Sequence, residues 1–173
     1  MTLELFRIDD RLVHGQVVIG WGLPHALGFL VVVDDEIAAA PWEQELYRMG
    51  APDGMEVRFA TVADAAAALP GYQADARAGM LLTSDVATMA RLVDAAPAVR
   101  QVTIGGLHHR ADRVPRLRFV FLSPSEETAL RALAARGVSV TAQDVPTSAP
   151  IALEAVLAAD GTCLLYTSDA ADE

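Results

Sequence analysis

Short apolar runs rich in β-branched residues alternate with longer Ala- and Leu-rich segments along most of this 173-residue chain. Strands that alternate with helices are joined by crossover connections, which favour a largely parallel sheet. Continuous apolar strands are typical of a sheet that is buried on both faces. The pattern therefore predicts a single doubly wound α/β domain, with a mostly parallel sheet and helices on both faces. The expected strands are residues 3–8, 29–33, 56–60, 79–82, 101–104, 119–122 and 138–142, and the expected helices are 15–25, 41–49, 62–69, 86–95, 123–136 and 151–159.

The segments that directly follow the expected strands are the first places to look for function. In doubly wound folds, ligands bind beyond the carboxyl ends of the strands. Polar side chains or paired glycines stand at several of these positions. The segments selected in this way are residues 9–14, 34–35, 83–85 and 105–109.

The basic residues narrow the chemistry of the chain, because all 13 are arginine and none is lysine. Neither a P-loop lysine nor a Schiff-base lysine can therefore be present. The formal net charge of −10 argues against nucleic acid as a partner, since an acidic surface repels phosphate backbones. The longest apolar run, residues 27–33, is too short to span a bilayer, and the N-terminus lacks the features of a signal peptide. We therefore expect a cytoplasmic protein.

The segment 163–173 resembles the in-frame translation of an adapter used in DNA library preparation. We expect this tail not to be native and exclude it from fold reasoning, so the domain is expected to span residues 1–162. The single cysteine of the chain, Cys163, lies in this tail. No disulfide or thiol chemistry is therefore expected.

The stretch of residues 7–16 follows the first expected strand and contains two carboxylates, two arginines and a histidine. His14 lies at or just before the start of the first expected helix, where unpaired backbone N–H groups attract an anion. The same helix end disfavours a charged imidazole, so His14 is expected to be neutral and therefore nucleophilic. These residues suit a phosphohistidine site, because phosphoryl transfer needs positioning and charge neutralisation more than acid–base chemistry.

The neighbours of His14 offer the other functions that a phosphoryl group requires. Arg11 can neutralise two phosphoryl oxygens with its guanidinium fork. Asp9 or Asp10 could fix the tautomer of His14 by hydrogen bonding to one ring nitrogen. Gly15 lets a phosphoryl group approach the backbone, because glycine has no Cβ. From residue types and spacing alone, a charged solvated turn with a capping histidine remains the competing interpretation.

The run of residues 7–16, followed by Trp21, resembles the active-site signature of enzyme IIB subunits from the mannose, fructose and sorbose family of sugar phosphotransferase systems. The similarity covers roughly residues 3–157. The resemblance implies that His14 receives phosphate from a IIA domain and donates it to a sugar held by the membrane subunits IIC and IID. It also implies that Arg11 contacts the phosphate and that no metal or dissociable cofactor takes part. The further similar segments are residues 31–36, 51–57, 103–108, 133–138 and 143–146.

From these observations we select the candidate site residues and partners. A IIA phosphodonor, the IIC and IID subunits and a hexose-type sugar are the expected partners, with the protein bound peripherally to the membrane transporter. The identity of the sugar is expected to depend mainly on the membrane subunits. The candidate catalytic residues are His14, Arg11 and Asp10, the candidate phosphate-binding residues are Gly15, Gln16, Ser84 and Gly106, and no metal ligand is expected.

Other polar residues have weaker functional interpretations. His108 and His109 follow the paired glycines, and one of them could border the phosphoryl site. Adjacent residues in an extended segment point to opposite sides, so both histidines cannot easily bind one metal ion. Ser84 could donate a hydrogen bond to phosphate, and either Ser84 or Asp85 could cap the helix expected at 86–95. The acidic run 34–36 is typical of a turn or cap. The arginines within 110–118 fit either a docking patch for an acidic partner or a solvated basic loop.

Other functions could use the same histidine loop. A regulatory phosphoacceptor would take phosphate from a IIA-like partner without ever meeting a sugar, and the sequence does not separate this role from transport. A hydrolase would use His14 as a base with Asp9 or Asp10 to orient it, but no Gly-x-Ser-x-Gly motif or native cysteine offers a nucleophile. Nucleotide binding is a weaker hypothesis, since neither Gly-x-Gly-x-x-Gly nor a P-loop is present.

Overall fold

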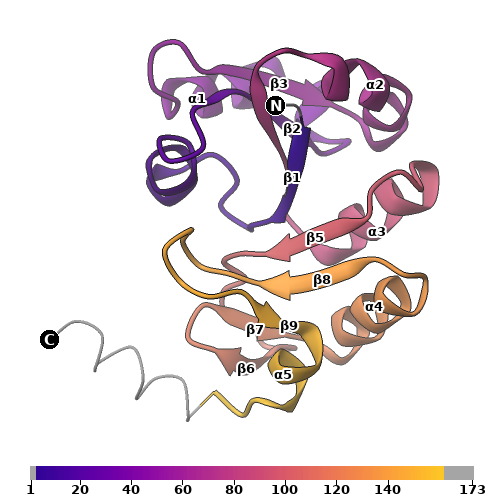
Figure 1. Ribbon diagram of the computed structural model, residues 1–173. Coiled ribbons are helices and arrows are strands. Elements are labelled where there is room, and N and C mark those ends of the chain that lie inside the picture. The colour runs from indigo at the N-terminus through magenta and orange to yellow at the C-terminus, as the bar shows by residue number, and fades with distance from the viewer. Residues whose placement is uncertain (1–2, 162–173) are drawn as a thin grey trace, which may run out of the picture.

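The computed structural model describes residues 3–161, and a seven-stranded sheet forms its centre (Figure 1). The predicted domain end at residue 162 and the adapter-like tail lie outside the described residues. The strands are β1 (Leu3–Ile8), β2 (Leu27–Val33), β3 (Glu56–Ala60), β4 (Ala78–Thr83), β5 (Gln101–Ile104), β8 (Ser139–Ala142) and β9 (Ile151–Ala152). Their order is β3-β2-β4-β1-β5-β8-β9, and each neighbouring pair is parallel except β8 and β9.

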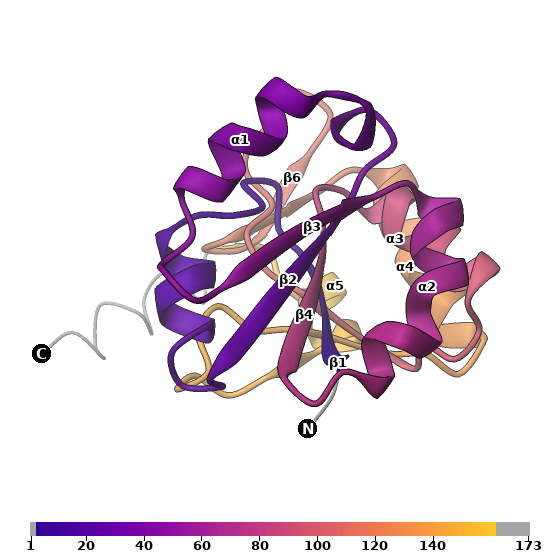
Figure 2. The ribbon, with the colours of Figure 1, turned by 90° about the horizontal axis from the view of Figure 1, so that it is seen from above.

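Helices cover both faces of this sheet, as Figure 2 shows. They are the π-helical segment η1 (Gln16–Trp21), the 3₁₀ turn η2 (Ile37–Ala39), α1 (Pro41–Met49), α2 (Val62–Ala74), α3 (Val86–Ala95), α4 (Pro124–Ala135) and α5 (Leu153–Ala158). One hydrophobic core lies between the sheet and α2, α3 and α4, and a second lies beneath η1 and α1. The predicted doubly wound α/β fold is therefore confirmed. Within residues 3–161, no helix combines the length and the apolar character that crossing a membrane requires.

The apolar sequence of β2 explains why this strand contributes to both cores. Phe29, Val31 and Val33 belong to the core beneath α2 and α3, whereas Leu30 and Val32 belong to the core beneath η1 and α1. Side chains alternate between the two faces along a strand, so a continuous apolar run fills both cores. All five side chains are fully buried, and such burial stabilises the fold by roughly 1.5–3 kcal/mol for each.

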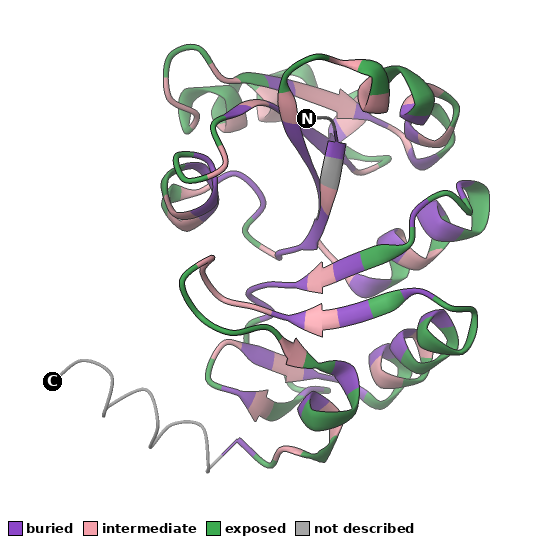
Figure 3. Ribbon diagram, viewed as in Figure 1, coloured by how far each residue is buried: buried purple, intermediate pink, exposed green. Residues whose placement is uncertain are grey.

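The sheet is less completely covered over β5 and β8, which alternate between buried and more exposed residues (Figure 3). Val102 and Val140 are buried, whereas Gln101 and Ser139 are exposed. This alternation indicates that one face of both strands packs on a core and the other carries polar side chains.

The helix expected at 15–25 is shorter than predicted. η1 has six residues and ends at Trp21. Gly22 follows it directly and Pro24 comes two residues later, and both residue types disfavour the continuation of a helix. His14 therefore precedes a short π-helical segment and not the full helix that the sequence predicts.

The C-terminal part of the chain differs most from the prediction. The strand expected at 119–122 is β7 (Val120–Leu122), which pairs antiparallel with β6 (Val114–Leu117) outside the main sheet. β6 was missed because Pro115 and Arg116 interrupt its short apolar pattern. The segment expected as a helix at 151–159 begins as β9, because Ile151 pairs with Ala142, and only its second part is helical.

Side chains at the helix starts show how the sequence sets the element boundaries. Asp85, not Ser84, caps α3 by accepting a 2.6 Å hydrogen bond from the Thr88 N–H. α2 continues beyond its expected end at residue 69 and includes Pro70. Tyr72 packs against the core there, so tertiary packing outweighs the local preference of proline.

The carboxyl ends of β1, β4 and β5 meet at one edge of the sheet. The Asp9 N–H donates to the Thr83 carbonyl at 2.9 Å, and the Asp10 N–H donates to the Gly106 carbonyl at 2.9 Å. The chain leaves β1 towards β2 on one side, whereas β5 adds to the other side of β1. This reversal is a topological switch point, where ligands bind in such folds.

Candidate active site

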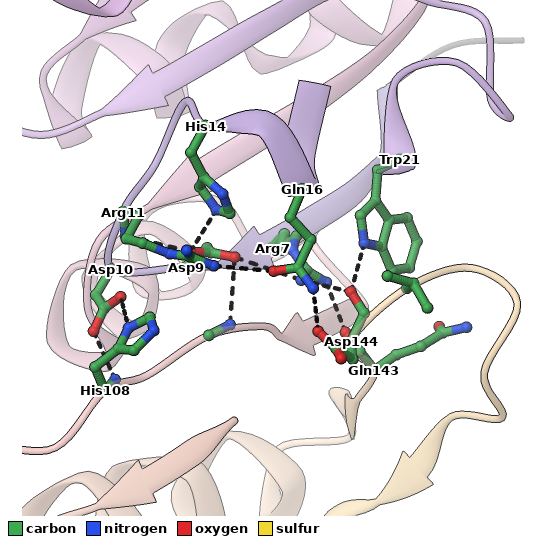
Figure 4. Close-up of polar contacts among 12 residues, drawn as sticks. Arg7, Asp9, Asp10, Arg11, His14, Gln16, Trp21, His108, Gln143 and Asp144 are labelled. Atoms are coloured by element: carbon green, nitrogen blue, oxygen red, sulfur yellow. Dashed lines mark hydrogen bonds and ion pairs between the residues drawn. The ribbon is translucent and has the colours of Figure 1, made fainter. Parts of the chain in front are cut away.

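His14 lies between β1 and η1, and a buried carboxylate holds its imidazole (Figure 4). His14 Nε2 is 3.0 Å from Asp9 Oδ1. The backbone N–H groups of Arg11 and Gly106 also donate to the Asp9 carboxylate, each at 3.3 Å. Burial by itself raises the pKa of Asp9, but the hydrogen bond and charge of His14, together with Arg7, lower that pKa below its ordinary value. A charged Asp9 accepts the Nε2–H of His14, so Nδ1 is the ring nitrogen that carries a lone pair.

The turn that returns His14 to Asp9 depends on an uncommon backbone conformation at Leu12. Its φ of 57° lies in the left-handed region, which residues with a side chain rarely adopt. The Leu12 N–H donates to the Asp9 carbonyl at 3.0 Å, and the Leu12 side chain is buried in the core beneath η1. The packing of Leu12 therefore stabilises a strained turn at the point where chemistry is expected.

Arg7 is buried beneath the pair of His14 and Asp9. It donates to the carbonyls of Gln143 at 2.8 Å and Asp144 at 3.1 Å, and its Nη2 lies 3.5 Å from Asp9 Oδ2. The guanidinium lies 4.7 Å from the centre of the Trp21 ring. Burial lowers the pKa of Arg7, while the charges of Asp9 and Asp144 oppose this change. Arg7 thus links the end of β1 to the segment that follows β8.

The paired glycines after β5 make room for functional side chains. A Cβ on Gly105 would lie 2.5 Å from the guanidinium of Arg7, and a Cβ on Gly106 would lie 3.3 Å from His108 Cε1. The Gly106 N–H donates to Asp9 Oδ2. Gly106, which the sequence suggested as a phosphate-binding residue, therefore contacts the carboxylate that holds His14.

A surface hollow of about 590 Å³ opens beside His14. Four of the candidates from the sequence meet in its wall, namely Arg11, His14, Gly15 and Gln16. Arg11 Nη2 donates to Gln16 Oε1 at 3.0 Å, and this contact holds the exposed guanidinium beside the start of η1. The structure therefore gathers a histidine, a cation and the first residues of η1 around one hollow. The remaining wall consists of His108, Arg118, Phe119 and Asp144.

The sequence reasoning missed Asp144, which connects this hollow to the C-terminal part of the chain. Its carboxylate accepts hydrogen bonds from Gln16 Nε2 and from Arg118 Nη2, the latter at 2.7 Å. Its backbone carbonyl accepts from Trp21 Nε1 at 2.9 Å. Asp144 follows β8 closely, so the rule that selects the carboxyl ends of strands would have found it if applied to that strand.

Asp10 holds His108 rather than His14. Asp10 Oδ1 lies 2.6 Å from His108 Nδ1, and Asp10 Oδ2 accepts from the His108 N–H at 2.7 Å. Asp9 and Asp10 are adjacent at the end of β1, and adjacent residues of an extended chain point to opposite sides. Of the two carboxylates that the sequence offered to hold His14, Asp9 does so, and the candidate catalytic residue Asp10 contacts His108 instead.

Ser84 lies in a second hollow of about 470 Å³, beside the first. Its wall includes Asp10 and Arg113, and it shares Arg11 and His108 with the hollow beside His14. The structure therefore does not place the candidate phosphate-binding residue Ser84 together with His14.

The remaining clusters have structural partners. Asp34 accepts backbone hydrogen bonds at the start of η2, as expected for a cap, and Asp35 pairs with Arg91 at 2.9 Å. His109 packs edge-on against Phe121 with 5.8 Å between ring centres. Within residues 3–161, no group of three or more His, Cys, Asp or Glu side chains is arranged to hold a metal ion. In the basic loop, Arg113 pairs with Glu126, Arg116 with Glu127 and Arg118 with Asp144.

The chain matches the family model for the sorbose subfamily IIB component of the phosphotransferase system over residues 3–165. It is 33% identical over 146 residues to the N-acetylgalactosamine-specific phosphotransferase enzyme IIB component 1 of Escherichia coli K12, covering 84% of this chain and 92% of that protein. It is 32% identical over 150 residues to the mannose-specific EIIAB component of the same organism, covering 85% of this chain. The chain spans about half of that longer relative, 46% of its length.

A solved structure agrees with these relatives. The IIB domain of the sorbose permease from Klebsiella pneumoniae has a TM-score of 0.80 with this chain at 26% identity, covering 91% of this chain and 97% of that one. The family predicted from the histidine loop is therefore confirmed. The chain belongs to the sorbose subfamily of IIB components of the sugar phosphotransferase system, within the mannose, fructose and sorbose family.

Proposed function

We propose that His14 carries the phosphoryl group of this IIB component, on its Nδ1 atom. IIB components accept phosphate from a IIA component and transfer it to a sugar, so the chain is a phosphotransferase. One observation supports His14 above all others. Asp9 accepts a hydrogen bond from Nε2 at 3.0 Å, and this leaves the lone pair on Nδ1 of an imidazole that lines the hollow.

Charging of His14 exchanges one bond to phosphorus for another. The lone pair of His14 Nδ1 attacks phosphorus, and the bond between phosphorus and the IIA donor breaks with its electron pair returning to the donor. Asp9 keeps the Nε2 proton in place and stabilises the positive charge that develops on the imidazole. Arg11 is exposed, so it can exchange its bond to Gln16 for bonds to phosphoryl oxygens. Gly15 and Gln16 line the same hollow, so their backbone N–H groups can approach those oxygens.

We propose a hexose-type sugar as the final acceptor, held by membrane subunits IIC and IID. The named relatives support this class, because they are specific for N-acetylgalactosamine, mannose or sorbose. The protein then acts at the cytoplasmic face of the membrane, bound peripherally to the transporter. The phosphodonor is the IIA component encoded with it.

Charging can be tested with the purified chain, phosphoenolpyruvate, the general phosphotransferase proteins and the IIA component of the same genome. We expect one acid-labile phosphoryl group on the wild-type protein and none on His14→Gln, measured by intact mass and peptide mapping. His25→Gln is a matched control, because His25 stacks on Trp21 with 5.4 Å between ring centres and does not line the hollow. NMR of the phosphorylated protein should identify Nδ1, and phosphorylation of His14→Gln or of Nε2 contradicts the proposal.

The same material separates transport from regulation. Membrane vesicles that contain IIC and IID are added to the charged protein with and without sugar. We expect the phosphoryl group to leave His14 only when both vesicles and sugar are present, with a sugar phosphate as product. A protein that is charged but never discharged in this way is instead a regulatory phosphoacceptor.

A further inference from the structure

A second histidine and aspartate pair borders the same hollow as His14. His108 and Asp10 form this pair, and His108 lines the hollow together with His14 and Arg11. We propose that His108 is the base that accepts the proton of the sugar hydroxyl when the phosphoryl group leaves His14, and that Asp10 is its positioning residue. This assignment rests on the proposed role of His14 as the phosphoryl carrier.

The contacts of Asp10 fix which nitrogen of His108 is available. Asp10 Oδ1 is 2.6 Å from His108 Nδ1, so Nδ1 carries the proton of the neutral ring. Asp10 Oδ2 accepts from the backbone N–H of the same residue at 2.7 Å. Both oxygens of one carboxylate therefore hold one histidine, and the lone pair of that histidine is on Nε2. The side chain of His108 is 53% exposed, so this nitrogen can meet a substrate.

A buried ion pair holds the backbone of His108 in place. Arg113 Nη1 donates to the His108 carbonyl at 2.8 Å, and the Arg113 side chain is 2% exposed. Arg113 forms two hydrogen bonds to the Glu126 carboxylate, each at 2.8 Å. Glu126 also belongs to the capping box of α4 together with Ser123. His108 is thus anchored to the start of α4. A group that contacts a reacting atom must be held in position in this way.

The position of His108 also fits the transfer geometry. The hollows beside His14 and beside Ser84 share Arg11 and His108, so these two side chains stand where the hollows adjoin. Figure 4 shows the adjacent carboxylates Asp9 and Asp10 turned towards different histidines. A sugar hydroxyl that approaches a phosphoryl group on His14 through this opening passes the half-exposed ring of His108.

Transfer to the sugar differs from charging because the acceptor is a hydroxyl group. The sugar oxygen attacks phosphorus, the bond between phosphorus and His14 Nδ1 breaks, and its electron pair returns to Nδ1. The hydroxyl proton moves to His108 Nε2, and Asp10 stabilises the imidazolium that forms. The exposed ring then releases this proton to water. Charging by IIA uses a nitrogen lone pair and removes no hydroxyl proton, so it does not need His108.

This difference makes the two steps separable by experiment. The full chain and its variants are charged with labelled phosphoenolpyruvate, the general proteins and IIA, and the donors are then removed. The charged proteins are mixed with vesicles containing IIC and IID and an equimolar mixture of mannose, fructose, sorbose and N-acetylgalactosamine. The measured quantities are the rate of charging, the rate at which His14 loses its label and the amount of sugar phosphate formed. The variants are His108→Gln, His108→Ala with and without imidazole, and the control His109→Gln.

We expect His108→Gln to be charged at the wild-type rate and discharged to sugar about a hundredfold more slowly. Added imidazole should accelerate the discharge of His108→Ala by about tenfold or more, because it replaces the missing base. His109→Gln should behave as the wild type in both steps, since His109 packs on Phe121 and does not line the hollow. Recovery by imidazole distinguishes a base from a residue that merely supports the loop.

Three results with the variants, and one with the wild type, overturn the assignment. The first three are discharge of His108→Gln at the wild-type rate, an equal loss of charging and discharge, and no effect of imidazole on His108→Ala. A wild-type protein that is charged on His14 but passes nothing to the sugar mixture also overturns it, because the reaction assigned to His108 is then missing. A wild-type protein that is not charged on His14 contradicts the proposed function itself, and the charging step reports that failure separately.

Discussion

The two adjacent carboxylates at the end of β1 make similar contacts with different consequences. Asp9 is fully buried and holds Nε2 of His14, whereas Asp10 is 23% exposed and holds Nδ1 of His108. The first pair leaves Nδ1 available on a largely buried imidazole, and the second leaves Nε2 available on a half-exposed one. Side chains of adjacent residues point to opposite sides at the end of β1. This alternation determines which histidine each of the two aspartates contacts.

The largest expected effect comes from removing one carboxylate charge at a time. Asp9→Asn should slow the charging of His14 by about a thousandfold, because an amide can favour the wrong imidazole tautomer and cannot stabilise positive charge. Asp10→Asn should be charged at close to the wild-type rate, since Asp10 contacts His108. Single-turnover charging by phosphorylated IIA measures both rates.

The order of these two effects decides whether the comparison holds. If Asp10→Asn loses as much charging activity as Asp9→Asn, the two pairs do not act separately. Far-ultraviolet circular dichroism of both variants is the control, because each substitution is nearly isosteric and should preserve the fold.

Much of the fold could be predicted because it depends on local patterns. The predicted boundaries of β1 and β3 and of helices α1 and α3 agree with the structure, where apolar runs, a proline in the first turn of α1 and the cap of α3 define them locally. The hairpin of β6 and β7 could not be predicted, because its pairing depends on partners that a short, charged segment does not specify. The same holds for β9, whose strand pairing with β8 interrupts a segment of helical composition.

The candidate site was predictable in part for the same reason. The density of charged residues around His14 identified the loop, and its position after a strand identified the edge of the sheet. The choice between Asp9 and Asp10 could not be made, because it depends on the left-handed turn at Leu12. The position of Asp144 just after β8 was detectable by the same rule, but its contact with Gln16, 128 positions away in the sequence, was not. Such contacts arise from the tertiary fold rather than from local spacing.

The second largest effect is expected from the buried arginine that contacts each histidine and aspartate pair. Arg7 contacts Asp9, and Arg113 contacts the carbonyl of His108. Arg7→Met should lower the free energy of unfolding by about 3–5 kcal/mol, because it leaves Asp9 buried without its cation and the Gln143 carbonyl without its donor. Arg113→Met should cost less, about 2–3 kcal/mol, because the Glu126 side chain is 11% exposed, whereas that of Asp9 is fully buried. Urea denaturation followed by fluorescence measures both changes.

Charge and hydrogen bonding at Arg7 can be separated with Arg7→Lys. Lysine keeps the positive charge but lacks the planar fork that reaches both carbonyls. We expect Arg7→Lys to lie between the wild type and Arg7→Met in stability. If Arg7→Met and Arg113→Met are equally stable, Arg7 does not stabilise the fold more than Arg113 does, and the prediction is wrong.

A smaller effect is expected in how the free energy of unfolding changes with pH in the acid range. The pKa of Asp9 is below its ordinary value, since the hydrogen bond and charge of His14, with Arg7, outweigh burial. Charged Asp9 therefore stabilises the fold above the ordinary carboxyl pKa of about 4, and this contribution is lost as the pH falls through the lowered pKa. Urea denaturation between about pH 6 and pH 2 should show a weaker pH dependence for Asp9→Asn than for the wild type.

Glu126, which pairs with Arg113 next to His108, allows the matching test for the second histidine. Burial by itself raises the pKa of Glu126, but Arg113 and Ser123 lower that pKa below its ordinary value. Glu126→Gln should therefore also weaken the acid dependence of stability while leaving the charging of His14 unchanged. A parallel pH dependence in the wild type and both variants shows that neither carboxylate contributes in this way.

The smallest effect tests whether the adjacent residues His108 and His109 also have separate roles, as Asp9 and Asp10 do. His109 packs edge-on against Phe121, whereas His108 is held by Asp10. His109→Gln should lower the free energy of unfolding by only about 0.5–1 kcal/mol, because His109 is exposed and a single edge-on ring contact contributes about that much. A double-mutant cycle with Phe121→Leu should recover a coupling of that size. A larger loss of stability, or a loss of sugar transfer in His109→Gln, means that His109 also supports the pair of His108 and Asp10 and takes part in the transfer.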